Sequence, residues 1–180
     1  MRVLYFADIR FPMERANGIQ TAETAHALAR RGIEVELMVR KSDDRNDEKC
    51  LEFFGLPLHP KLRLQRVSTP LGRWSYVQSA LSSLLRSRSE PAVLYTRDLF
   101  VADLAVRSRH LHGVPVVYEA HTVSAIFAEE RRDMYEEEDE APGTKLVRLD
   151  ARERRVCQRA SGIVAITRAL RDALEERHSR

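Results

Sequence analysis

Short apolar runs alternate with amphipathic segments along the whole chain, and this alternation is the strongest constraint on its fold. The apolar runs have the length of single strands, and the segments between them repeat apolar residues at helical spacing. Strands are expected at residues 2–7, 35–39, 62–67, 92–95, 114–118 and 162–166, and helices at 18–31, 74–88, 99–111, 146–159 and 168–176. Strands that alternate with helices predict an α/β fold: a doubly wound, mainly parallel sheet in a Rossmann-like three-layer sandwich.

The segments between these elements are polar. Residues 9–17 are expected to form a loop, and residues 41–52 either a long surface loop or a short helix. With 180 residues, 43% hydrophobic and 32% charged, the chain has the size and composition of one soluble globular domain. No run of eighteen apolar residues occurs, and the N-terminal apolar stretch is too short for us to expect a signal peptide.

Charge and cysteine content exclude several classes of function. The net charge of +3 permits contact with phosphate groups or an anionic membrane surface without requiring either. No aromatic-interleaved basic patch or helix-turn-helix signature occurs, which argues against nucleic acid as a partner. Cys50 and Cys157 are far apart and lack Cys-x-x-Cys spacing, so no zinc ribbon or dithiol motif is predicted. The chain has the character of a reduced, cytoplasmic protein.

The most informative local segment is Val-Pro-Val-Val-Tyr-Glu-Ala-His-Thr at residues 114–122, an apolar run that ends in Glu119 and His121. Such a run is typical of a buried parallel strand, and open α/β sheets bind ligands beyond the carboxyl ends of their strands. Side chains alternate along an extended segment, so Glu119 and His121 are expected to point the same way and flank one spot. They could act as acid and base or orient a sugar hydroxyl. No second His, Cys or Asp follows at metal-ligand spacing, so no metal is expected.

Three other strand-to-helix junctions carry candidate residues. Asn17 and Gly18 open a helix, where free amides favour anions, although either residue can simply cap the helix. Only one glycine is present, so the Gly-x-Gly-x-x-Gly fingerprint of nicotinamide and flavin cofactors is absent. Arg97 could pair with a phosphate or carboxylate, whereas Asp98 and Thr167 are expected as N-caps of the helices that follow them. His110 and His112, near a helix end, are expected to favour the helix dipole as cations.

Four segments, in this order, resemble the N-terminal half of family-four glycosyltransferases of the two-domain GT-B fold. They are residues 17–39 with Arg-Arg-Gly-Ile-Glu-Val, residues 94–98 (Leu-Tyr-Thr-Arg-Asp), residues 116–121 (Val-Val-Tyr-Glu-Ala-His) and residues 153–167, which end in Gly-Ile-Val-Ala-Ile-Thr. The resemblance implies one Rossmann-like domain over residues 1–180. It also implies transfer of a sugar from a nucleotide-sugar, a co-substrate, with retention of configuration and without a metal or other cofactor.

The resemblance also assigns roles to individual positions. His121 would contact the transferred sugar or the reacting centre, with Glu119 beside it, and is the expected catalytic residue. The remaining cleft residues would be Asn17, Gly18 and Gln20 near the acceptor and the donor phosphates, Tyr95 and Arg97 on the acceptor side, and Thr167 and Arg168 at the cleft edge.

A complete enzyme of this family continues into a C-terminal donor-binding domain, which we expect to lie outside these 180 residues. The chain alone is therefore expected to be inactive and to need that domain, or a partner subunit, as well as a sugar or lipid-linked acceptor. Two alternatives stay open: a non-enzymatic α/β interaction module, and half of another GT-B enzyme such as a sugar-nucleotide epimerase. Peripheral contact with the inner membrane face is a further hypothesis, because Trp74, Arg86 and Arg88 fall on one helix. The favoured alternative is that this is a core-packing helix with a charged outer face.

Overall fold

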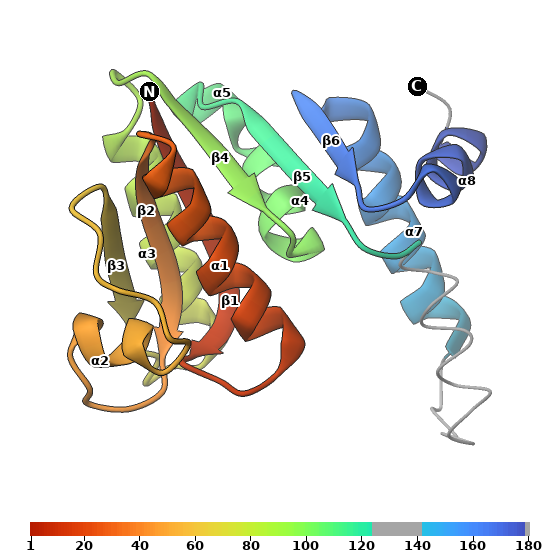
Figure 1. Cartoon of the computed structure of the whole chain (residues 1–180). Coiled ribbons are helices and arrows are strands. Elements are labelled where there is room, and N and C mark those ends of the chain that lie inside the picture. The colour runs from red at the N-terminus through yellow and green to blue at the C-terminus, as the bar shows by residue number, and fades with distance from the viewer. Residues whose placement is uncertain (124–141, 179–180) are drawn as a thin grey trace.

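The computed structural model describes residues 1–123 and 142–178 and has a six-stranded sheet at its centre (Figure 1). All neighbouring strands are parallel, in the order β3-β2-β1-β4-β5-β6. The strands are β1 (Arg2–Phe11), β2 (Glu34–Lys41), β3 (Leu62–Val67), β4 (Ala92–Thr96), β5 (Val116–Ala120) and β6 (Gly162–Ala165). The order reverses between β1 and β4, and this switch point is where doubly wound sheets bind ligands. The predicted fold class is confirmed.

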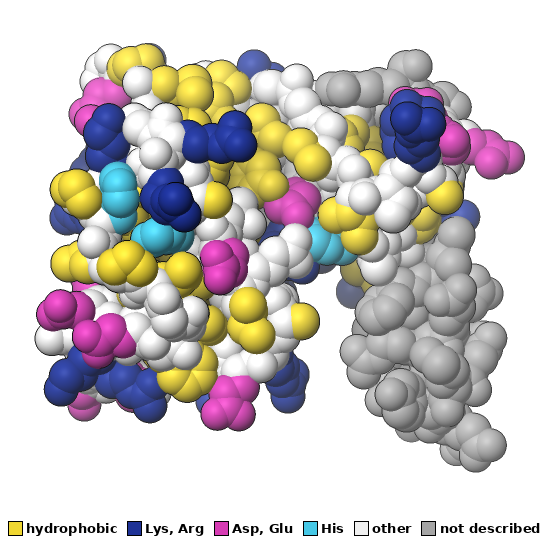
Figure 2. Space-filling model, viewed as in Figure 1, with side chains coloured by type: hydrophobic (Ala, Val, Ile, Leu, Met, Phe, Trp, Pro, Cys, Tyr) yellow, Lys and Arg dark blue, Asp and Glu magenta, His cyan; other side chains and the backbone are white. Residues whose placement is uncertain are grey.

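Helices cover both faces of the sheet, because successive side chains of each strand point to opposite sides. The helices are α1 (Ala16–Arg30), α2 (Asp47–Glu52), α3 (Arg73–Arg86), α4 (Leu99–Arg107), α5 (Arg109–His112), α7 (Pro142–Arg159) and α8 (Arg168–His178). Tyr5 and Leu37 share one apolar core with α1 and α2, whereas Leu4, Phe6 and Leu94 share the other with α3, α4 and α7. On the face shown in Figure 2, basic, acidic and hydrophobic side chains are interspersed. No helix in the described ranges is long and apolar enough to cross a membrane.

Strand β1 is longer than its sequence predicts. Residues 9–11 were expected in a loop, but Arg10 and Phe11 pair with Arg40 and Lys41 of β2 after a register shift. Two tertiary contacts explain the extension: the Phe11 side chain is fully buried in the core on the α1 side, and Asp8 forms a 2.9 Å ion pair with Arg40. Neither contact is visible in the local pattern of apolar residues.

The helix expected over residues 99–111 is two helices that break at Ser108. The Ser108 hydroxyl donates to the Leu104 carbonyl at 2.8 Å, which is the kind of local bond that competes with helix continuation. His112 is buried, with Nε2 3.1 Å from the Ala105 carbonyl oxygen and Nδ1 accepting from the Val114 amide at 2.9 Å. Burial lowers the pKa of His112. The prediction that His112 acts as a cation on the helix dipole is therefore wrong, because the residue is a neutral link between α4 and the segment that precedes β5.

Candidate functional site

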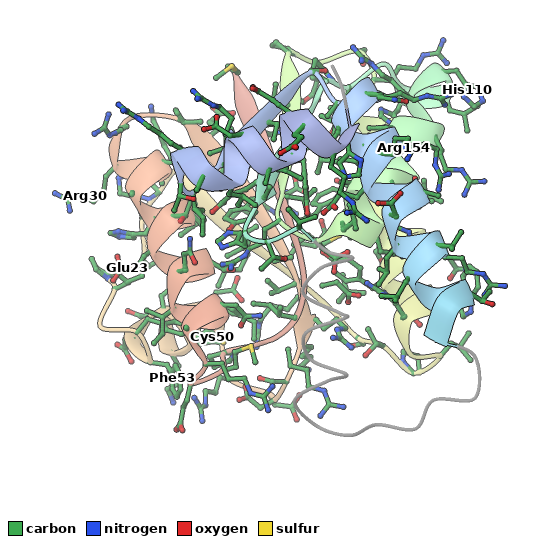
Figure 3. All side chains as sticks on the ribbon, turned by 90° about the vertical axis from the view of Figure 1, so that its right-hand side faces the viewer. Glu23, Arg30, Cys50, Phe53, His110 and Arg154 are labelled. Atoms are coloured by element: carbon green, nitrogen blue, oxygen red, sulfur yellow. The ribbon has the colours of Figure 1, made fainter. Side chains whose placement is uncertain are left out.

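The candidate site lies at the carboxyl ends of β4 and β5, beside α1. Tyr95 is in β4 and Glu119 in β5, while Arg97 and His121 follow the last residues of these two strands. Seen from the β6 side, α1 and α7 flank the sheet and α8 crosses in front of it (Figure 3). Glu23 and Arg30, labelled in that view, project from the outer side of α1, so its inner side is left to face the sheet.

Four side chains form a closed ring of hydrogen bonds. Arg97 donates from Nη1 to Gln20 Oε1 at 2.9 Å, and its Nη2 lies 3.2 Å from His121 Nδ1. Gln20 Nε2 donates to Glu119 Oε1 at 3.2 Å, and His121 Nε2 lies 2.7 Å from the same oxygen. The Tyr95 hydroxyl donates to the other oxygen, Glu119 Oε2. We call Gln20, Tyr95, Arg97, Glu119 and His121 the polar ring.

The donor and the acceptor of every hydrogen bond in the polar ring can be assigned from Arg97 and Glu119. A guanidinium only donates, and a carboxylate only accepts. His121 Nδ1 must therefore accept from Arg97, and Nε2 must carry the proton that is donated to Glu119. The Gln20 amide is fixed in the same way, with its oxygen toward Arg97 and its nitrogen toward Glu119. The ring thus holds His121 as one neutral tautomer in one orientation.

This geometry changes the interpretation of Glu119 and His121. The two side chains do point the same way, as alternation predicts, but they bond to each other instead of standing on either side of a substrate position. Glu119 is only 5% exposed and accepts from three side chains, whereas 23% of the His121 side chain is exposed. Glu119 therefore serves as the anchor of the ring, and His121 and Arg97 are the members that a ligand can reach.

Two tyrosines of the sheet lie at the site: Tyr95, a member of the polar ring, and Tyr5, which packs against it. Burial, together with the hydrogen bond to Glu119, holds the pKa of Tyr95 well above its usual range. Burial also raises the pKa of Tyr5 to about 12. The Tyr5 and Tyr95 rings meet edge to face with centroids 5.1 Å apart, at paired positions of β1 and β4. Sequence reasoning missed Tyr5, because its place under the site depends on β1 lying beside β4.

Asn17 and Gly18 lie in the first turn of α1, and the alternative that one of them is the cap of this helix is wrong. The N-cap residue is Arg15, which makes no side-chain cap bond. A Cβ at Gly18 would lie 2.4 Å from Met13 Cγ and 2.7 Å from the Met13 carbonyl oxygen. The backbone that approaches Gly18 is thus that of the preceding loop. Asn17 Oδ1 is buried and has no hydrogen-bond partner among the described residues.

Thr167 and Arg168 do not take part in the polar ring. Both line a separate cavity of about 330 Å³ next to β6 and α8, together with Ile163 and Leu174. Thr167 Oγ1 accepts from the Leu170 amide at 3.1 Å and caps α8, and Asp98 caps α4 through the Val101 amide at 2.9 Å. Both predicted caps are confirmed. The described part of the chain contains no cluster of His, Cys, Asp and Glu that could hold a metal ion.

A doubly wound parallel sheet of this strand order is the architecture of a Rossmann-like domain, and its polar side chains gather at the switch point. Residues 17–180 match the family model described as the glycosyl transferase 4-like domain, and the chain belongs to this family. The search against curated protein sequences finds no match.

Solved structures of GT-B glycosyltransferases share the fold. HepE from Anabaena, crystallised with UDP-glucose, is 14% identical with a TM-score of 0.58, over 100% of this chain and 41% of HepE. Sucrose-phosphate synthase from Thermosynechococcus elongatus is 13% identical with a TM-score of 0.63, over 98% of this chain and 45% of the synthase. This chain spans less than half the length of either protein and has the fold of one half of a GT-B enzyme.

Proposed function

We propose that this chain is the acceptor-binding half of a retaining glycosyltransferase, which moves a sugar, of hexosyl type, from a nucleotide-sugar to an acceptor in carbohydrate biosynthesis. The observation that carries the proposal is the polar ring, which presents His121 at the switch point of a sheet in a chain of the glycosyl transferase 4-like family. Retention and the acceptor role are what the family resemblance implies. We also propose, on the same basis, that transfer uses no metal or other cofactor.

His121 is proposed to contact the transferred sugar. A residue that touches a reacting sugar must be held in one orientation, because small misplacements cost large factors in rate. The polar ring provides this restraint through Arg97 at Nδ1 and Glu119 at Nε2. With both ring nitrogens engaged, His121 offers an ordered surface for a sugar instead of a free base. Asn17, Gly18, Thr167 and Arg168 stay proposed cleft residues outside the ring.

Sugar binding tests the proposal for His121. We expect sugars and sugar-phosphates, titrated against the purified chain by calorimetry, to bind about tenfold or more weakly to His121→Ala, since one well-placed contact is worth about 1.4 kcal/mol or more. His110→Ala, at an exposed histidine of α5, is the matched control and should bind like the native chain. Equal binding by His121→Ala would contradict the role. Absence of any sugar binding would favour a non-enzymatic interaction module.

A second domain is proposed to supply the donor site, either within the same protein or in a partner subunit. Stabilisation of the leaving diphosphate is a major catalytic contribution in sugar transfer, and this chain spans only 41% and 45% of the two similar enzymes. We expect these 180 residues alone to give no appreciable transfer from nucleotide-sugars in a radiolabel assay. Robust transfer by the purified chain would contradict this expectation.

The protein is proposed to work in the cytoplasm, with peripheral contact to the membrane that would carry a lipid-linked acceptor. The structure changes which residues support that contact. Trp74 is 72% exposed at the start of α3, but Arg86 ends the same helix, about 18 Å away at 1.5 Å per residue. Although Trp74, Arg86 and Arg88 were expected on one helix, Trp74 and the two arginines are thus at opposite ends of α3, and Arg88 lies beyond it. Leu71, which is also 72% exposed, lies three residues before Trp74, and these two exposed apolar side chains are the proposed membrane contact.

A further inference from the structure

Arg97 differs from the other partly buried arginines of this protein. Among the described residues, five further arginines are half-buried, and each forms an ion pair with a carboxylate: Arg2, Arg40, Arg66, Arg152 and Arg155. Arg97 is half-buried too, but its described contacts are to the amide oxygen of Gln20 and the imidazole of His121. Both of these acceptors are neutral, so Arg97 carries a partly desolvated charge that no carboxylate of residues 1–123 or 142–178 contacts directly.

The guanidinium of Arg97 also has donors to spare. Arginine carries five N–H groups in a planar fork, and the two bonds within the polar ring use one on each terminal nitrogen. Three N–H groups stay available without any change in the ring. Phosphate and carboxylate groups match this fork, because two of their oxygens can accept from it at once.

The charges around Arg97 favour an incoming anion. Glu119 is the carboxylate of the polar ring, yet it is 5% exposed and accepts from Tyr95, Gln20 and His121. The first turn of α1, which leads into Gln20, contains no acidic residue, and its N-cap residue makes no side-chain cap. The partial positive charge of that helix end is therefore not offset by an acidic residue within the first turn. An anion that approaches the polar ring meets Arg97 before it meets Glu119.

We propose that Arg97 binds an anionic group of the acceptor, so that the acceptor is a phosphorylated or carboxylated sugar. This inference rests on the proposed function and narrows its substrate class. The polar ring would then bind the acceptor and orient His121 through the same guanidinium. Arg97 holds the acceptor by its charged group, and the same guanidinium, through Nη2, keeps His121 oriented toward the sugar.

The test compares charged and neutral sugars on the same protein. Glucose, glucose 6-phosphate and glucuronate are titrated by calorimetry against the full chain, with inorganic phosphate as a competitor. We expect at least one charged sugar to bind about tenfold or more tightly than glucose. Competition with inorganic phosphate then shows whether the phosphate group alone accounts for that affinity. Arg97→Gln should lose this preference. Arg97→Lys, which keeps the charge without the fork, should keep part of it.

Arg63→Gln removes an exposed arginine from β3 and is the matched control, which should keep the full preference. Equal affinity of the native chain for glucose and both charged sugars would overturn the inference and leave the proposed function standing. If Arg97→Gln still prefers charged sugars to glucose, Arg97 is only a structural member of the polar ring, and this result would also overturn the inference. If none of the three sugars binds, the proposed function fails and the inference fails with it.

Discussion

Gly18 and Glu119 show how single residues decide the shape of this site. Glu119 is buried because three donors from α1, β4 and the end of β5 satisfy its carboxylate, and buried polar groups are stable only when they are paired. Gly18 is needed because Met13 occupies the space that a side chain would fill. Each residue was a candidate from sequence for another reason, Glu119 as an acid or base and Gly18 as a cap or a ligand contact.

Replacing Gly18 tests the close approach of Met13. Gly18→Ala places a Cβ against Met13 Cγ and its carbonyl oxygen, so the loop before α1 must shift. We expect the free energy of unfolding in urea to fall by about 1–3 kcal/mol, the range for overpacked sites. Gly162→Ala is the control, because its Cβ would meet Val117 Cγ2 at 3.6 Å, an ordinary contact. An equal loss in both variants would show that the Met13 contact is not the cause.

At the scale of elements, the boundaries that differ from prediction are those that tertiary contacts decide. The extension of β1 to Phe11 depends on a core position and on an ion pair with β2. The break between α4 and α5 combines the local bond of Ser108 to Leu104 with the buried His112, which bonds Ala105 and Val114. The periodicity of apolar residues, which located most elements correctly, does not report such contacts.

The His112 link should make stability depend on pH. Its pKa in the folded protein is lowered from the ordinary value of 6.5 by burial, so below that pH the unfolded chain binds more protons than the folded one. The contribution of His112 is thus complete above about pH 6.5 and is lost as the pH falls through the lowered folded value. We expect the stability advantage of the native chain over His112→Asn, measured by urea unfolding, to be largest near pH 7.5 and to shrink toward pH 5. A constant difference across this range would contradict the assignment.

At the scale of the whole molecule, the exposed Leu71 lies between β3 and α3, and the exposed Trp74 lies in the first turn of α3. If these side chains meet a membrane, removing both should weaken the association, because buried apolar area stabilises interfacial binding. We expect the double variant Leu71→Ala/Trp74→Ala to co-sediment severalfold less with anionic liposomes than the native chain. Leu111→Ala, at another exposed leucine, should not change it. Failure of the native chain to bind liposomes at all would discard membrane contact.

The alternation of apolar runs and amphipathic segments determined, from sequence alone, that this chain forms a parallel doubly wound sheet, and the strand-end positions of Arg97, Glu119 and His121 marked the site. Only the tertiary structure decided that Gln20 joins them, that Thr167 and Arg168 stay apart, and that Glu119 anchors His121 instead of working beside it. The bonds concerned join residues separated by as many as 99 positions, as between Gln20 and Glu119. Local patterns report which side of a strand is buried, whereas the partners of a polar side chain depend on which strands and helices become neighbours.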